Sequence, residues 1–192
     1  VNGWSRSVFV ILAMTLLFAA SISEVFKSSY QALPKGQLEA GLSIGLTDYQ
    51  TFVRALHYIN ETLAKKMAGD GEGATALFET KVIGAQSKEQ AKILAKSVIC
   101  SNLTKAAIFG HDANWGRILC AMGYSGAKFD PEKVDLYFES AAGKLKIIEN
   151  GVALDYSEEE ATKVLSEKAV TAVADIKMGE ASASAWGCDL TY

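Results

Sequence analysis

Residues 75–99 read TALFETKVIGAQSKEQAKILAKSVI, and this stretch decides the fold class. Its first nine residues, 75–83, form a short, largely apolar run of the kind that predicts a strand. Ser87-Lys88-Glu89-Gln90 is a capping box, which predicts that a helix begins there. The apolar residues that follow recur at steps of three and four, so an amphipathic helix should continue to about Ile99.

Further strands and helices are predicted downstream of this unit. Short apolar runs and alternation with a period of two favour strands, and a second capping box at Ser157 favours a helix. In chain order we expect a buried strand at 104–109, a short helix ending near Gly123, a strand at 134–139, its hairpin partner from Leu145, a turn at 149–151, a helix from Ser157 and a strand at 169–176. Because hairpins occur beside crossovers in this order, the predicted fold class is α+β.

Upstream of the stretch, the apolar residues between Asp48 and Met67 recur at three- and four-residue steps. They predict an amphipathic helix of about five turns, whose start Thr47 or Asp48 can cap. The helix should stop at 69–73, GDGEG, because three glycines in five residues allow positive φ angles and close backbone approach.

Residues 8–20, VFVILAMTLLFAA, are apolar except for Thr15. The run is shorter than the roughly 20 residues that a membrane-spanning helix needs. We favour a helix or strand buried in a core. The apolar region of a signal peptide is the alternative, since Arg6 precedes the run and small residues follow it.

The composition excludes several classes of protein. The chain has 192 residues, 19 Lys plus Arg, 22 Asp plus Glu, a net charge of -3 and 49% hydrophobic residues, which excludes a disordered, collagen-like or disulfide-scaffold protein. Its slight acidity argues against nucleic-acid and membrane partners. Three widely spaced cysteines favour a reducing compartment, so we expect a cytoplasmic protein.

The common cofactor and metal motifs are missing from the sequence, so neither a cofactor nor a metal is predicted. Two loops could carry chemistry. In the first, Glu72 on its glycine-rich turn can accept hydrogen bonds from a substrate ammonium group. Spacing alone favours the simpler interpretation, a helix end with an exposed glutamate.

The second loop is 111–117, HDANWGR. Asp112 or Asn114 can cap the short helix, and Arg117 can pair with a carboxylate. Spacing favours a rigid turn anchored by Trp115. Near the end of the chain, Cys188 has no flanking base and is interpreted as a small packed residue rather than a nucleophile.

Three stretches together resemble one known family. They are LAKKMAGDGEGATALFE (63–79), SNLTKAAIFGHDANWGRILCAMGYSG (101–126) and AWGCDL (185–190). Over residues 48–192 the chain closely resembles the β subunit of the bifunctional ornithine acetyltransferase and N-acetylglutamate synthase family of arginine biosynthesis.

The resemblance implies a self-cleaving N-terminal-threonine acyltransferase fold, with mixed sheets covered by helices. Residues 1–73 would belong to the nucleophile-bearing domain and 74–192 to a smaller C-terminal α+β domain. The family is made as one precursor, and its β chain begins with the nucleophilic threonine. That threonine is expected upstream of Val1, so no catalytic residue is assigned in this chain.

In this family the threonine moves acetyl from N2-acetylornithine to glutamate, and some members also accept acetyl-coenzyme A. No metal or cofactor is required. An α subunit from the same precursor contributes the oxyanion hole, and the assembly contains two α and two β chains. A eukaryotic member would act in the mitochondrial matrix.

Residue by residue, Glu72 falls on the family's substrate-binding glutamate. Asp70, Gly71, Gly73 and Thr75 match the loop that shapes this site, whereas the HDANWGR loop matches a mainly architectural motif. Two alternatives are a non-catalytic or truncated homologue that serves as an interaction module, suggested by the unmatched residues 4–7, and an amidohydrolase of the same wider fold.

Overall fold

The structure is a computed structural model that describes residues 6–31 and 35–190. After Ile59 the chain divides into two compact units, 1–59 and 60–192. The elements are α1 (Arg6–Gln31), α2 (Lys35–Ser43), α3 (Asp48–Gly69), β1 (Leu77–Ala85), α4 (Lys88–Ile99), α5 (Asn102–Phe109), α6 (Trp115–Gly123), the 3-10 helix η1 (Pro131–Lys133), β2 (Asp135–Ser140), β3 (Gly143–Glu149), β4 (Val152–Ala153), α7 (Glu158–Leu165), β5 (Ala169–Asp175) and β6 (Ala181–Cys188).

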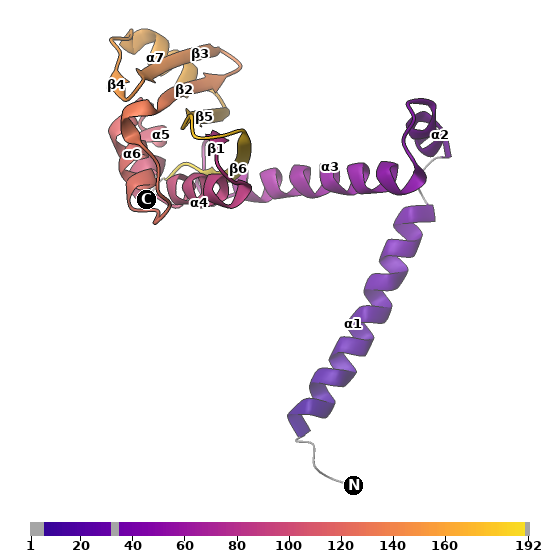
Figure 1. Ribbon diagram of the computed structural model, residues 1–192. Helices are drawn as coiled ribbons and strands as arrows, with labels where there is room; N and C mark the ends of the chain where they lie inside the picture. The colour runs from indigo at the N-terminus through magenta and orange to yellow at the C-terminus, as the bar shows by residue number, and fades with distance from the viewer. Residues whose placement is uncertain (1–5, 32–34, 191–192) are drawn as a thin grey trace. The chain divides into compact units, whose positions relative to one another are not determined.

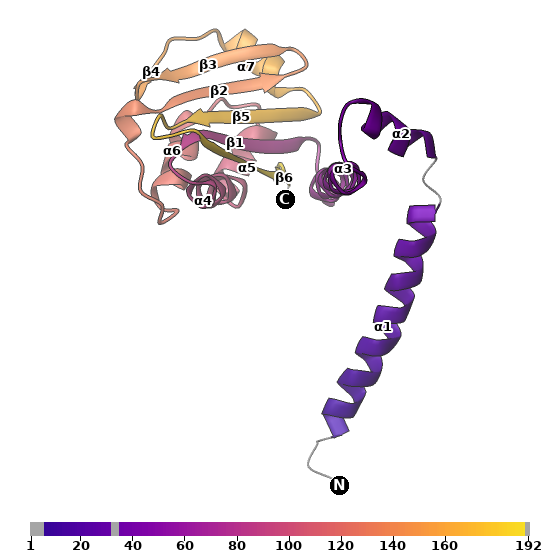
Figure 2. The ribbon, with the colours of Figure 1, turned by 45° about the vertical axis from the view of Figure 1, so that its right-hand side comes forward.

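The C-terminal unit is built on one six-stranded sheet. Its strand order is β4-β3-β2-β5-β1-β6, which Figure 2 shows from the upper edge of the sheet to the lower one. The pair of β1 and β5 is parallel, and the other four pairs are antiparallel. The sheet is therefore mixed and carries helices, which confirms the α+β prediction (Figure 1).

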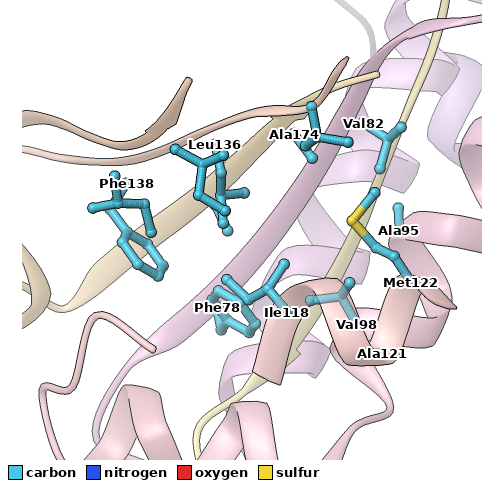
Figure 3. Packing of buried hydrophobic residues seen from close by; sticks show 14 of the residues in the cluster. Phe78, Val82, Ala95, Val98, Ile118, Ala121, Met122, Leu136, Phe138 and Ala174 are labelled. Carbon is cyan, nitrogen blue, oxygen red and sulfur yellow. The ribbon is translucent and has the colours of Figure 1, made fainter. Parts of the chain in front are cut away.

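The core of this unit lies on one face of the sheet. Alternate residues of β1 and β2, such as Phe78, Val82, Leu136 and Phe138, point the same way and are buried. They join one cluster with side chains of the helices, including Val98 of α4 and Ile118 and Met122 of α6 (Figure 3). Ile108 of α5 and Leu165 of α7 belong to the same cluster. Apolar and polar residues alternate over 134–139, and this pattern predicts a sheet that is covered on one face only.

Both predicted capping boxes begin helices. Ser87 accepts a hydrogen bond from the backbone N–H of Gln90 at 3.2 Å, and Gln90 Oε1 accepts one from the N–H of Gln86 at 2.8 Å. Ser157 accepts from the N–H of Glu160 at 3.4 Å. The caps satisfy N–H groups that lack partners within the helix, so α4 and α7 begin where the sequence predicts.

One prediction was wrong, because residues 104–109 are helical. Ser101 caps α5 by accepting from the N–H of Thr104 at 3.3 Å, and α4 ends only two residues earlier. A short segment such as 104–109, TKAAIF, fits a buried strand and a short buried helix equally well, and here the cap decides. A second difference is β6, which the pattern did not reveal because its residues are mostly small.

In the N-terminal unit, the expectation of a buried apolar run was also wrong. Residues 8–20 lie in α1, but their large side chains are exposed, by 59% at Phe9 and 70% at Leu16. Apolar side chains gain free energy when they are buried, but an apolar run does not by itself provide the surface against which it would pack. Within 6–31 and 35–190, no helix combines the length and apolar character needed for a bilayer crossing.

The amphipathic helix predicted from Asp48 is α3, which runs to Gly69. Thr47 is its cap, since its hydroxyl accepts from the N–H of Gln50 at 3.2 Å. The predicted division of the whole protein into domains at residues 73 and 74 stays a prediction. Within this chain, residues 60–69 of α3 belong to the same compact unit as the sheet.

Candidate functional site

Glu72 lies at the tip of a tight turn between α3 and β1. The N–H of Ala74 donates to the carbonyl of Gly71 at 2.9 Å, which closes a four-residue turn over 71–74. Gly73 has a φ of +74°, and Glu72 is not among the residues with positive φ. This sign pattern is that of a type II turn, which requires glycine at its third position. The side chain of Glu72, at the second position, is exposed.

The start of the turn is packed against the end of β6. A Cβ atom at position 71 would lie 2.7 Å from Sγ of Cys188, so any side chain there would force the thiol to shift. Glycine at 71 lets the backbone approach the thiol in its present position. Cys188 is half-buried beneath the turn, which matches its interpretation as a packed residue.

The end of the turn is bound by Asp189, which is only 3% exposed. Its Oδ1 accepts from the N–H of Thr75 at 2.9 Å and from the N–H of Ala76 at 3.3 Å, and its Oδ2 accepts from the Thr75 hydroxyl. In return the N–H of Asp189 donates to the carbonyl of Ala76 at 3.2 Å. The backbone bond continues the β1–β6 ladder, whose last pair joins Leu77 to Cys188, and the three side-chain bonds reinforce it.

Sequence reasoning found the turn but missed Asp189. The residue stands 114 positions from Thr75 and follows a strand that the pattern did not reveal. The register of β1 and β6 is what brings the two together. The available signal was the AWGCDL stretch, in which the resemblance to the family includes this aspartate.

A shallow hollow of about 550 Å³ lies beside the turn. Its lining residues are Lys65, Lys66, Met67, Gly69 and Asp70. Of the predicted loop residues, only Asp70 borders the hollow, whereas the Glu72 side chain is exposed at the turn. The role of Glu72 in substrate binding, and that of Asp70, Gly71, Gly73 and Thr75 in shaping the site, stay predictions.

Lys65 carries positive charge beside the hollow. A hydrogen bond to Glu61, with the two charged atoms 2.8 Å apart, raises its pKa against the lowering effect of burial. Its Nζ also lies 5.2 Å from the centre of the Trp186 ring, within the range of a cation–π contact. Charged side chains of both signs, those of Lys65, Lys66 and Asp70, therefore line the hollow.

The second loop, 111–117, is held by internal contacts. Asn114 caps α6 by accepting from the N–H of Arg117 at 3.1 Å, and its amide donates to Asp112 at 3.0 Å. Arg117 Nη1 donates to the carbonyl of Leu103 at 2.9 Å rather than to a carboxylate. These contacts tie α6 to α5, as expected for a rigid turn.

The chemistry that this arrangement supports is recognition of a cation. A carboxylate on a turn anchored at both ends loses little freedom when it binds an ammonium group, and such charge-assisted bonds are about twice as strong as neutral ones. Around the turn, the carboxylates of Asp70 and Glu72 are the groups that could bind such a cation. Cys188 is packed against Gly71.

Comparison with known proteins gives consistent matches. The model of the ArgJ family matches residues 29–192. The chain is 52% identical over 137 residues to the arginine biosynthesis bifunctional protein ArgJ of Thermotoga neapolitana, covering 71% of this chain and 34% of that protein. It is 51% identical over 148 residues to the ArgJ protein of Caldanaerobacter subterraneus subsp. tengcongensis, covering 77% and 37%. The chain thus spans about a third of the length of these curated relatives.

The crystal structure of the ArgJ protein of Bacillus halodurans is similar in fold. Its TM-score is 0.71 at 41% sequence identity, and the match covers 79% of this chain and 73% of that one. The similarity therefore extends beyond the glycine turn to most of the described elements.

Proposed function

Because the chain belongs to the ArgJ family, we propose that it is the β subunit of a bifunctional acetyltransferase of arginine biosynthesis. The enzyme transfers acetyl from N2-acetyl-L-ornithine to L-glutamate, and acetyl-coenzyme A is a further candidate donor. Its partners are an α subunit from the same precursor and a second β chain, in an α2β2 assembly. The observation that carries the proposal is Glu72 on its anchored, exposed turn.

The charge of the donor explains why a carboxylate suits this position. In N2-acetylornithine the α-nitrogen bears the acetyl group, so the side-chain amine is the only free amine and is protonated at neutral pH. A carboxylate that accepts its hydrogen bonds stabilises the bound donor. The glutamate acceptor has a carboxylate in the corresponding part of its side chain, so the contact would discriminate between the two substrates.

The reaction proceeds in two balanced steps. In the first step, the hydroxyl of the β-chain threonine, expected upstream of Val1, attacks the acetyl carbonyl. The hydroxyl proton passes through the freed α-amine to the nitrogen of the departing ornithine. The product of this step is an acetyl-threonine ester. The α-amine of glutamate then attacks this ester and regenerates the threonine. An α-amine with a pKa of about 7.7 to 8.0 can relay these protons near neutral pH.

The test is acetyl exchange by the full-length gene product. The purified, self-cleaved complex should form N-acetylglutamate from N-acetylornithine and glutamate, and mass spectrometry should find one acetyl group on the β-chain threonine when glutamate is omitted. A variant with that threonine changed to alanine is the control. A folded αβ complex without exchange would refute the proposal.

One observation favours a second candidate, a non-catalytic interaction module. Residues before 29 lie outside the segment that the family model matches, and the apolar helix α1 begins there with exposed side chains. An αβ complex that assembles but transfers no acetyl group, together with loss of assembly when residues 6–31 are deleted, would support the module.

A further inference from the structure

We propose that Asp189 is a positioning residue for substrate binding, because it fixes the turn that carries Glu72. This inference rests on the proposed function and adds a residue to it. Asp189 acts without touching the substrate. It acts by holding Thr75 and Ala76, so that the carboxylate of Glu72 is presented in one place.

Two contacts bracket the turn. On its N-terminal side, Gly71 sits against Cys188, and on its C-terminal side, Thr75 and Ala76 are bound to Asp189. Both anchors come from consecutive residues at the end of β6. Glu72 and Gly73 thus form the tip of a loop whose two ends meet the same short segment.

That segment is itself immobilised by the helices. A Cβ atom at Gly187 would lie 2.6 Å from Cγ2 of Ile99, so the backbone of β6 presses closely on α4. On the other side of Asp189, the N–H of Leu190 donates to the carbonyl of Lys105 in α5 at 3.3 Å. Through Asp189, the turn is therefore held in a fixed position relative to α4 and α5.

The charge of Asp189 makes the anchoring specific. A buried carboxylate is costly unless its oxygens accept hydrogen bonds. In the described part of the chain, Asp189 takes part in no ion pair, and its oxygens accept from three donors of residues 75 and 76. Movement of the turn would leave this charge unsatisfied, so the native position is strongly favoured.

The consequence is a selective loss when the anchor is weakened. When the turn is mobile, binding of the ammonium group by Glu72 must order it, which costs conformational entropy. This cost is the same in the ground state and in the transition state. Loss of such uniform binding raises KM and leaves kcat unchanged. The glutamate acceptor lacks the ammonium in its side chain, so its KM should change little.

The experiment uses the full-length, self-cleaved complex with Asp189→Asn, Thr75→Val and Thr75→Ser. We expect Asp189→Asn to raise KM for N-acetylornithine about tenfold, as loss of a charge-assisted contact implies. Thr75→Val should raise it less, and Thr75→Ser, which keeps the hydroxyl donor, should restore the wild-type value. Thr75 variants keep the test decisive if Asp189→Asn folds poorly.

A double-mutant cycle separates positioning from general damage. In a Glu72→Ala background, Asp189→Asn should change KM less than about twofold, because the contact through which it acts is already gone. Asp135→Asn, a buried aspartate in another part of the sheet, is the matched control and should lower Tm without changing KM.

The outcomes distinguish this inference from the proposed function. Absence of exchange by the wild-type complex refutes the proposed function and with it this inference. Normal exchange by the wild type with an unchanged KM in Asp189→Asn and Thr75→Val overturns the inference alone. Fully multiplicative effects of Glu72→Ala and Asp189→Asn also overturn it.

Discussion

Oδ1 of Asp135 accepts a hydrogen bond from Nζ of Lys177 at 2.6 Å, across 42 residues of sequence. The same oxygen accepts from the N–H of Asn150 at 2.7 Å, and Oδ2 lies 3.1 Å from Nζ of Lys146. One buried carboxylate therefore joins β2, β3, the β3–β4 turn and the segment after β5. Burial, the largest single influence, raises the pKa of Asp135, but the hydrogen bonds and the charge of Lys177 together lower it to about 2.

This network should make part of the stability depend on pH. The pKa of the same carboxyl in the unfolded chain is near 3.8, so the unfolded state takes up its proton first. The contribution, about 2 kcal/mol, is fully present above pH 4 and is lost as the pH falls from about 4 to about 2. Denaturant unfolding of wild type and Asp135→Asn across pH 2 to 6 measures it.

In that experiment the stability difference between wild type and Asp135→Asn should shrink toward pH 2. Asp130→Asn is a suitable control, because Asp130 pairs with Lys133 at the surface and an asparagine still caps η1. A difference that stays constant from pH 2 to 6 would contradict the role given to Asp135.

Gly151→Ala, in the β3–β4 turn, should strongly destabilise the protein. Gly151 has a φ of +74°, and a Cβ there would lie 2.5 Å from Cα of Glu132, where backbone cannot yield. Strain and overpacking together predict a loss of about 2 to 5 kcal/mol in the free energy of unfolding. Thermal and denaturant unfolding provide the measurement.

Two glycines serve as matched controls for that substitution. Gly126 has a φ of +86° but open space around a Cβ, so Gly126→Ala should cost only the strain of about 1 to 2 kcal/mol. Gly123 has open space and no positive φ, so Gly123→Ala should be neutral. Equal losses at 151 and 126 would show that the contact with Glu132 does not matter.

Glu72→Ala should impair binding of the acetyl donor. Loss of a charge-assisted contact predicts that KM for N-acetylornithine rises about 10- to 100-fold, with a much smaller change in kcat. Steady-state acetyl exchange by the full-length complex measures both constants. Glu180→Ala is the control, since Glu180 is also exposed and lies before the other end of β6. An unchanged KM would exclude Glu72 from the site.

Residues 60–192 should fold without the preceding helices. They form one compact unit that contains the whole sheet and its buried cluster. We expect the fragment to unfold in one cooperative transition, with a Tm within a few degrees of that of the 192-residue chain. Circular dichroism and calorimetry test this. A fragment with helical signal but no cooperative transition would show that residues before 60 complete the core.

The sequence predicted elements best where short-range interactions decide them. Ser87 and Ser157 cap helices through N–H groups three residues away, and the alternation over 134–139 reports one covered face of a sheet. The helix at 104–109 was predicted as a strand, because the six residues TKAAIF are too few to show a distinct period. β6 was missed because the residues that alternate in ASASAWGC are alanine and serine, which are too small to give a strong apolar signal.

Glu72 and its glycine turn were visible in the sequence because the turn is local. Gly73 provides the positive φ and Gly71 the close approach, both within four residues. Asp189 was not predicted as part of the site, since nothing near it in the chain indicates a partner 114 residues away.

By itself the sequence determined the α+β class, the starts of α3, α4 and α7 and the turn that carries Glu72. Capping, periodicity and glycine conformations act over a few residues, so they can be read along the chain. Only the tertiary structure decided that Cys188 and Asp189 hold that turn and that Asp135 ties β2 to three other segments. Strand register sets those contacts, and register arises from packing the whole sheet against its helices rather than from any single segment.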